Sequence, residues 1–135
     1  MNNIFLDTIN GKSSSRPPVW FMRQAGRILP SYRKLKESHN FYDMMKDPEL
    51  SSEVTLLPIN DLGVDSAILF SDILVIPDAL GLDLIFTKNG PKFTNALNNE
   101  NFNHLNFDPQ KLEYIYTIIK KTVENKNTTP LIGFC

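Results

Sequence analysis

The chain has 135 residues, of which 41% are hydrophobic and 21% charged, and its formal net charge is −1. This composition is that of a globular protein with one domain at most, and it excludes extended disorder. The near-neutral charge argues against nucleic acid as the main partner, and the apolar runs are too short to cross a bilayer. Since no signal segment opens the chain, we expect a cytoplasmic protein with neither nucleic-acid nor membrane partners.

Residues 1–16 are predicted to form an N-terminal arm and linker. The arm contains an apolar triplet, Ile4-Phe5-Leu6, which is typical of a short helix, and a polar run of Asn, Gly, Lys and Ser separates it from the body. The aromatic and β-branched residues after Val19 then predict a first strand. Beyond this strand the sequence predicts helices over residues 30–39 and 41–46, the former opened by a proline at its first position.

Basic residues are concentrated around the end of the predicted first strand. A concentrated cationic segment favours an anionic ligand, and the planar guanidinium of arginine suits carboxylates in particular. The alternative is a buried strand followed by a solvated basic loop, since most charge runs lie on solvated faces. The stretch from residue 16 to residue 36 contains no Asp or Glu and carries Arg16, Arg23, Arg27, Arg33, Lys34 and Lys36.

Asp47-Pro48 predicts the start of a longer helix. The Asp47 side chain can accept hydrogen bonds from the first free amides, and Pro48 has no amide hydrogen to leave unpaired. Val54 and Leu57 should then point inward, and Pro58 should bend or end the helix.

Residues 63–70 predict a second strand that ends in Ser71-Asp72. Its last four residues are apolar on both faces, which is typical of a parallel sheet covered on both sides. If the extended conformation continues, Ile68, Phe70 and Asp72 project to one side, so that an apolar wall leads to a single carboxylate. The alternative for Asp72 is a simple helix cap.

The remainder of the chain predicts five further segments. Residues 73–80 form a short helix ended by Gly81, residues 83–93 form a hairpin, and residues 95–107 form an exposed loop. Asp108-Pro109 opens a long amphipathic helix to about Asn125, and a third strand starts at residue 130. The apolar stripe of the long helix is expected to pack in the core and consists of Leu112, Ile115, Tyr116, Ile119 and Val123.

Strands and helices therefore alternate along the chain, which predicts an α/β fold with a parallel sheet. Right-handed crossovers then leave a doubly wound sheet or a (β/α) barrel. Both folds place their sites at the C-terminal ends of the strands. Arg23, Arg27 and Asp72 lie at or just beyond the ends of the first two predicted strands, so these residues are the candidates for binding a ligand.

Four short segments resemble a known family. Residues 20–27, Trp-Phe-Met-Arg-Gln-Ala-Gly-Arg, with Leu-Pro-Ser-Tyr-Arg at 29–33, resemble the N-terminal signature of uroporphyrinogen decarboxylase, and residues 70–74 and 131–134 are similar to later parts of the same family. This resemblance implies a (β/α)8 TIM barrel, of which the chain would supply about the first three β/α units. Residues 1–135 would be the N-terminal part of that single barrel domain, and the complete protein would be a homodimer.

The resemblance also implies an activity and a site. The family removes carboxyl groups from the four acetate side chains of uroporphyrinogen III, a tetrapyrrole, giving coproporphyrinogen III. Asp72 would bind the pyrrole N–H groups and stabilise a cationic intermediate. Arg23 would bind substrate carboxylates and assist catalysis, and the rest of the substrate-binding set would be Gln24, Ala25, Gly26 and Arg27. No cofactor is implied, because the pyrrole itself is the electron sink, and no Cys or His cluster has metal-ligand spacing.

Two alternatives remain at this point. A barrel takes about 250 residues, so the chain could be a truncated, non-catalytic remnant, and missing site residues from later strands argue against turnover by these 135 residues alone. A related corrinoid-linked methyltransferase barrel is the other alternative, and it would need a Cys/His zinc site.

Overall fold

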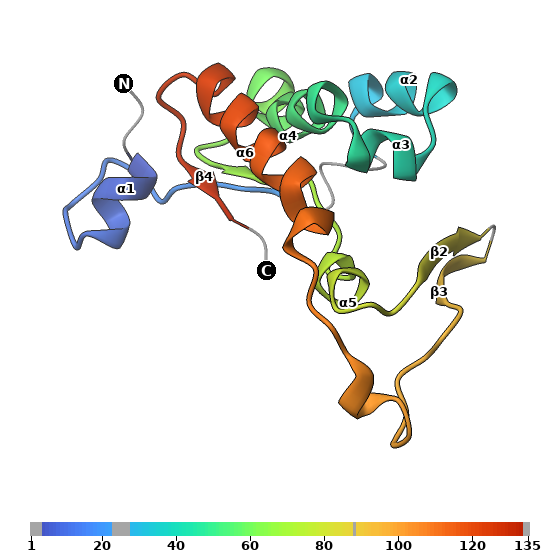
Figure 1. The fold of residues 1–135 in the computed structure, drawn as a ribbon. Coiled ribbons are helices and arrows are strands. Elements are labelled where there is room, and N and C mark those ends of the chain that lie inside the picture. Colours follow the sequence, from blue (N-terminus) through green and yellow to red (C-terminus); the bar gives the residue numbers. More distant parts are fainter. Residues whose placement is uncertain (1–3, 23–27, 88, 134–135) are drawn as a thin grey trace.

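The structure is a computed structural model that describes residues 4–22, 28–87 and 89–133, and it is a mixed α/β arrangement (Figure 1). Two short 3-10 turns, Phe102–His104 and Pro109–Leu112, interrupt the later part of the chain. The strands are β1 (Ala67–Ile68), β2 (Leu84–Thr87), β3 (Gly90–Phe93) and β4 (Leu131–Ile132). The helices are α1 (Ile4–Ile9), α2 (Pro30–Ser38), α3 (Phe41–Lys46), α4 (Pro48–Leu62), α5 (Val75–Ala79) and α6 (Glu113–Asn125).

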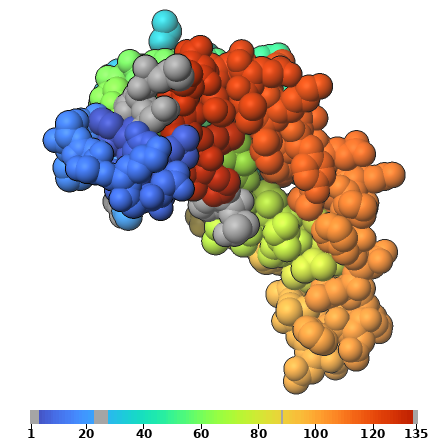
Figure 2. Space-filling model, turned by 90° about the vertical axis from the view of Figure 1, so that its left-hand side faces the viewer, coloured from blue at the N-terminus to red at the C-terminus, as the bar shows by residue number. Residues whose placement is uncertain are grey.

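The strands β1 and β4 pair in parallel, with Ala67 opposite Leu131, which confirms the parallel pairing expected for the second and third predicted strands. Helices α4 and α6 pack against each other and lie over one face of this pair, while α1 lies beyond its end (Figure 1). The strands β2 and β3 form a separate antiparallel hairpin, as predicted. Figure 2 shows that the segment between the hairpin and α6 projects away from the helical body.

The predicted first strand is wrong for residues 19–22, where the described chain forms no strand. Val19 instead makes two hydrogen bonds with Asp65: its amide donates to Asp65 Oδ2 (2.7 Å), and its carbonyl accepts from the Asp65 amide (3.0 Å). The Asp65 carboxylate thus accepts the hydrogen bond from the Val19 amide that a backbone carbonyl would accept in a pair of strands. The second strand is also shorter than the predicted residues 63–70, because β1 begins at Ala67 and ends at Ile68.

Side chains of α4 bind the chain just beyond β1. The Phe70 amide donates to Thr55 Oγ1 (2.9 Å), and the Phe70 carbonyl accepts from Ser51 Oγ (3.0 Å). Both buried backbone groups of Phe70 therefore have side-chain partners on α4.

Pro58 was predicted to bend or end α4, and the second alternative is wrong, because the helix continues to Leu62. A proline in a helix interior removes one hydrogen bond and crowds the preceding turn. Here the surrounding turns are buried, with Val54 at 0% and Leu57 at 8% exposure, so packing compensates for that loss. The helix ends instead at Gly63, whose φ of 65° is the left-handed conformation that glycine adopts without strain.

Two residues of the predicted stripe on α6 are not in the core. Tyr116 is 60% and Val123 48% exposed, whereas Ile118 and Thr122 are buried. At about 100° per residue, Tyr116 and Val123 point about 160° and 140° away from Ile118 around the helix. The face that contacts α4 is thus centred on Ile118 and Thr122, although Leu112, which precedes the helix, is buried as expected.

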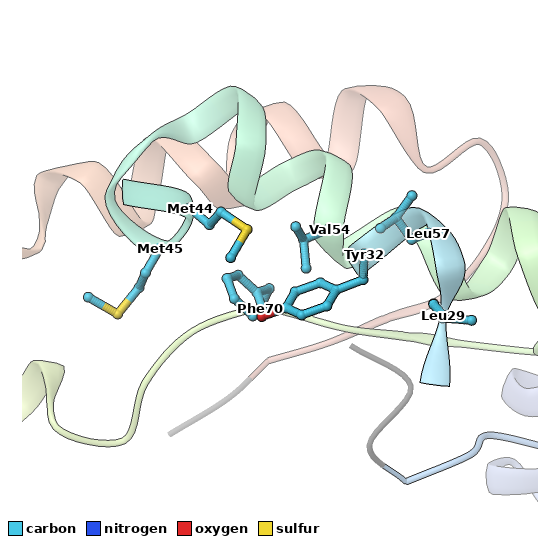
Figure 3. Close-up of a cluster of buried hydrophobic side chains, with 7 residues drawn as sticks. All are labelled: Leu29, Tyr32, Met44, Met45, Val54, Leu57 and Phe70. Carbon is cyan, nitrogen blue, oxygen red and sulfur yellow. The ribbon is translucent and has the colours of Figure 1, made fainter. Parts of the chain in front are cut away.

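The main core lies where α2, α3 and α4 meet the residues after β1 (Figure 3). Phe70 is at its centre, with its ring edge-on to Tyr32 (6.3 Å between centroids) and to Phe41 (5.6 Å). The inward direction predicted for Val54 and Leu57 is confirmed. The cluster consists of Leu29, Tyr32, Met44, Met45, Val54, Leu57 and Phe70.

The N-terminal arm is tied to the body by an ion pair. Arg16 makes two hydrogen bonds to Asp65, at 2.6 Å and 2.8 Å, and the Asp65 side chain is only 1% exposed. These bonds raise the pKa of Arg16, so the guanidinium stays charged. The paired geometry fixes both the position and the orientation of the chain that leads to Val19.

Replacing Asp47 tests the cap of α4. Its Oδ1 accepts from the amides of Glu49 (2.8 Å) and Leu50 (3.0 Å). We expect Asp47→Ala to lower the free energy of unfolding by about 1 kcal/mol, measured by urea denaturation. Asp47→Asn keeps an acceptor oxygen and should cost much less, so equal losses in the two variants would contradict the capping role.

Replacing Arg16 tests the ion pair. Arg16→Gln leaves a buried carboxylate without its cationic partner, so the urea midpoint should fall. Lys12→Gln is the matched control, because Lys12 pairs with Asp7 at 3.0 Å on the surface, where both side chains are exposed. Equal midpoints for the two variants would show that the Arg16–Asp65 pair does not stabilise the fold.

Candidate functional site

Asp72 lies in the turn between β1 and α5. Its Oδ1 accepts from the Leu74 amide (2.8 Å), and its carbonyl accepts from the Val75 amide (3.3 Å). The capping alternative for Asp72 is thus present in the structure. This bond occupies one carboxylate oxygen, and Oδ2 has no hydrogen-bond partner among the described residues.

The half-buried Asp72 carboxylate lies at a groove of about 850 Å³ between α3 and the β2–β3 hairpin. The ring of Phe86 is 5.6 Å from those of Phe41 and Tyr42, so aromatic side chains form much of its wall. Asp72 is the one charged residue among the described residues that line it. An acid at one end of an aromatic groove suits a ligand that combines flat rings with N–H donors. The lining residues are Asn40, Phe41, Tyr42, Asp72, Leu84, Ile85, Phe86, Thr87, Gly90 and Pro91.

The sequence-predicted binding residues Arg23, Gln24, Ala25, Gly26 and Arg27 lie outside the described residues. Whether they share a cavity with Asp72 therefore stays a prediction. The described chain resumes at Ile28, and the next residue, Leu29, is 2% exposed and belongs to the same core cluster as Phe70. The C-terminal flank of the arginine segment is thus anchored in the core that supports the turn containing Asp72.

Sequence reasoning missed the two α4 hydroxyls that hold the chain just before Asp72. Ser51 and Thr55 are 0% and 1% exposed and bind both backbone groups of Phe70. Their spacing of four residues places them on one face of the helix. The sequence signal that could have identified these two residues is the presence of hydroxyl groups on the buried face of the helix, since buried polar groups are nearly always hydrogen-bonded.

A second charged cluster lies beside the groove. Lys46 Nζ is 3.9 Å from the Tyr114 ring centroid and 3.9 Å from an Asp78 carboxylate oxygen, and Lys111 also pairs with Asp78 at 3.8 Å. Burial lowers the pKa of Lys46, while burial and then the charge of Asp78 raise the pKa of Tyr114 to about 12. The cluster joins α3, α5 and α6, and its cations already have an acidic partner.

Two searches of the described residues gave negative findings. No group of three or more His, Cys, Asp or Glu side chains among residues 4–22, 28–87 and 89–133 could hold a metal ion. In the same part of the chain, every helix is too short or too polar to cross a bilayer.

Comparisons with known proteins identify the family of the chain. A family model described as "Uroporphyrinogen decarboxylase (URO-D)" matches residues 1–135. The chain is 47% identical over 141 residues to a uroporphyrinogen decarboxylase from Sulfurovum sp., covering 99% of this chain and 41% of that protein. It is 49% identical over 127 residues to the Rickettsia felis protein of the same name, covering 91% of this chain and 37% of the relative.

A third relative, from Christiangramia forsetii, carries the same name and is 41% identical over 138 residues, covering 98% of this chain and 40% of its own length. The chain thus spans about two fifths of the length of the curated relatives it matches. Since the family model matches all 135 residues, the chain belongs to the uroporphyrinogen decarboxylase family.

Proposed function

We propose that this chain is the N-terminal part of a cytoplasmic enzyme that decarboxylates the four acetate side chains of uroporphyrinogen III. Residues 1–135 would supply about the first three β/α units of a single (β/α)8 barrel domain, with residues 1–16 as its arm and linker. The family match and the parallel β1–β4 pair support this proposal. The complete enzyme would be a homodimer and would use no cofactor.

The observation that carries the proposal is the Asp72 carboxylate at the aromatic groove. One of its oxygens is held by the Leu74 amide, and the other has no partner among the described residues. A reduced tetrapyrrole presents several N–H donors toward its centre, and a carboxylate can accept more than one of them. A fixed negative charge also favours the cation that forms in the reaction.

The reaction places specific demands on this charge. A proton adds to a ring carbon of one pyrrole, and the ring becomes cationic. The bond between the acetate methylene and its carboxylate then breaks, carbon dioxide leaves, and the released electron pair neutralises the ring. A proton adds to the methylene carbon to give the methyl group, and the ring carbon loses its extra proton. Asp72 would stabilise the cationic stage, because its negative charge would lie close to the ring without transferring atoms.

The arginine segment would bind the rim of the substrate. Arg23 and Arg27 would hold substrate carboxylates through paired hydrogen bonds. The Gln24, Ala25 and Gly26 backbone would complete this rim. Arginine keeps its proton at neutral pH, so Arg23 would contribute to catalysis by positioning a carboxylate rather than as a simple acid.

Asp72→Asn tests the proposal in the complete protein that contains residues 1–135. Asparagine keeps an acceptor for the Leu74 amide but loses the charge, so kcat should fall by about a hundredfold to a thousandfold. Carbon dioxide release from uroporphyrinogen III gives the rate. Asp83→Asn is the control, because Asp83 is exposed and does not line the groove. Unchanged turnover in Asp72→Asn would remove this residue from the mechanism.

A chimera separates a working N-terminal part from a remnant. Residues 1–135 would replace the matching two fifths of the Sulfurovum relative, which is 47% identical in this region. We expect the chimera to release carbon dioxide from uroporphyrinogen III and to lose that activity with Asp72→Asn. A folded but inactive chimera would favour the non-catalytic remnant.

A further inference from the structure

Two buried hydroxyl groups on α4 form hydrogen bonds with the backbone of Phe70, two residues before Asp72. The Phe70 amide donates to Thr55 Oγ1 at 2.9 Å, and the Phe70 carbonyl accepts from Ser51 Oγ at 3.0 Å. Thr55 Oγ1 also donates its own proton to the Ser51 carbonyl at 2.8 Å. Each hydroxyl therefore has a fixed direction, because its single proton is already used.

These bonds lie just beyond the β1 strand. The Leu69 amide donates to the Ile132 carbonyl at 3.1 Å, so the residue before Phe70 is still bonded to the chain of β4. Phe70 is 8% exposed, so its backbone groups need partners inside the protein. The two α4 hydroxyls supply them and so support the chain that leads to the site.

The Asp72 side of the turn is held independently. Its Oδ1 accepts from the Leu74 amide, and its carbonyl accepts from the Val75 amide. The position of the carboxylate thus depends on two supports, one on each side along the chain. The support from α4 connects it to the main core through Phe70, and Val75 also packs against that core.

We propose that Ser51 and Thr55 are positioning residues that set where the Asp72 carboxylate lies at the groove. This inference rests on the proposed function, since it assigns Asp72 to the reaction. Charge stabilisation depends steeply on placement, and a displacement of about 1 Å can cost about a hundredfold in rate. A partial release of Phe70 should therefore lower kcat by about tenfold while KM changes much less, because the carboxylate-binding arginines lie elsewhere in the chain.

The kinetic test uses the complete protein with Thr55→Val and Ser51→Ala. Both variants keep the approximate shape of the side chain and remove hydrogen bonds to Phe70. The matched control is Ser52→Ala, because the Ser52 hydroxyl is equally buried but has no hydrogen-bond partner in the part of the chain that the structure describes. Thr55→Ser keeps the hydroxyl and should restore most of kcat. Thermal denaturation of each variant shows whether it has lost the whole fold. If Thr55→Val does not fold, Ser51→Ala is used in its place.

A second measurement does not depend on turnover. The carboxyl ¹³C resonance of Asp72, assigned by its loss in Asp72→Asn, should shift in Thr55→Val and Ser51→Ala and stay in place in Ser52→Ala. If the wild-type protein does not decarboxylate uroporphyrinogen III, the proposed function fails, and this resonance still decides the positioning role. An unmoved resonance in both Ser51 and Thr55 variants, with or without a change in kcat, would overturn the inference.

Discussion

The hydrogen bonds between α4 and Phe70 are the interaction on which the rest of this structure depends. Phe70 is held twice, through its ring in the core with Tyr32 and through its backbone by Ser51 and Thr55. A buried backbone without partners would cost more than the hydroxyl groups lose by leaving water. The helix therefore holds the chain just after β1, and beyond this point the chain turns toward α5 with Asp72 at that turn.

The groove follows from the same core. Phe41 contacts Phe70 on one side and Phe86 on the other, with both pairs of ring centroids 5.6 Å apart. This series of rings connects the core to the β2–β3 hairpin and forms the aromatic wall next to Asp72. Side chains that stabilise the fold are thus also the surface that a ligand would meet, so a change at Phe41 would act on both.

Local signals in the sequence predicted the elements that local chemistry controls. Asp47-Pro48 gave the start of α4, and the turn residues near Gly90 gave the hairpin. The errors occurred where contacts with residues distant in the sequence determine the structure. Pro58 does not end α4 because tertiary packing compensates for its missing bond, and the contact face of α6 is centred on Thr122 because that face meets α4. Periodicity identifies an apolar stripe but cannot tell which side of it finds a partner.

From its position in the sequence, Asp72 could be either a helix cap or an acid that binds a ligand. The structure shows that these two roles are compatible, because a carboxylate has two oxygens. The bond from the Leu74 amide to Oδ1 fixes the rotation of the side chain. That rotation leaves Oδ2 for a ligand, and an acceptor held in place before the ligand arrives needs little reorganisation when charge develops. The cap is then part of how an acid in this turn would stabilise a cation.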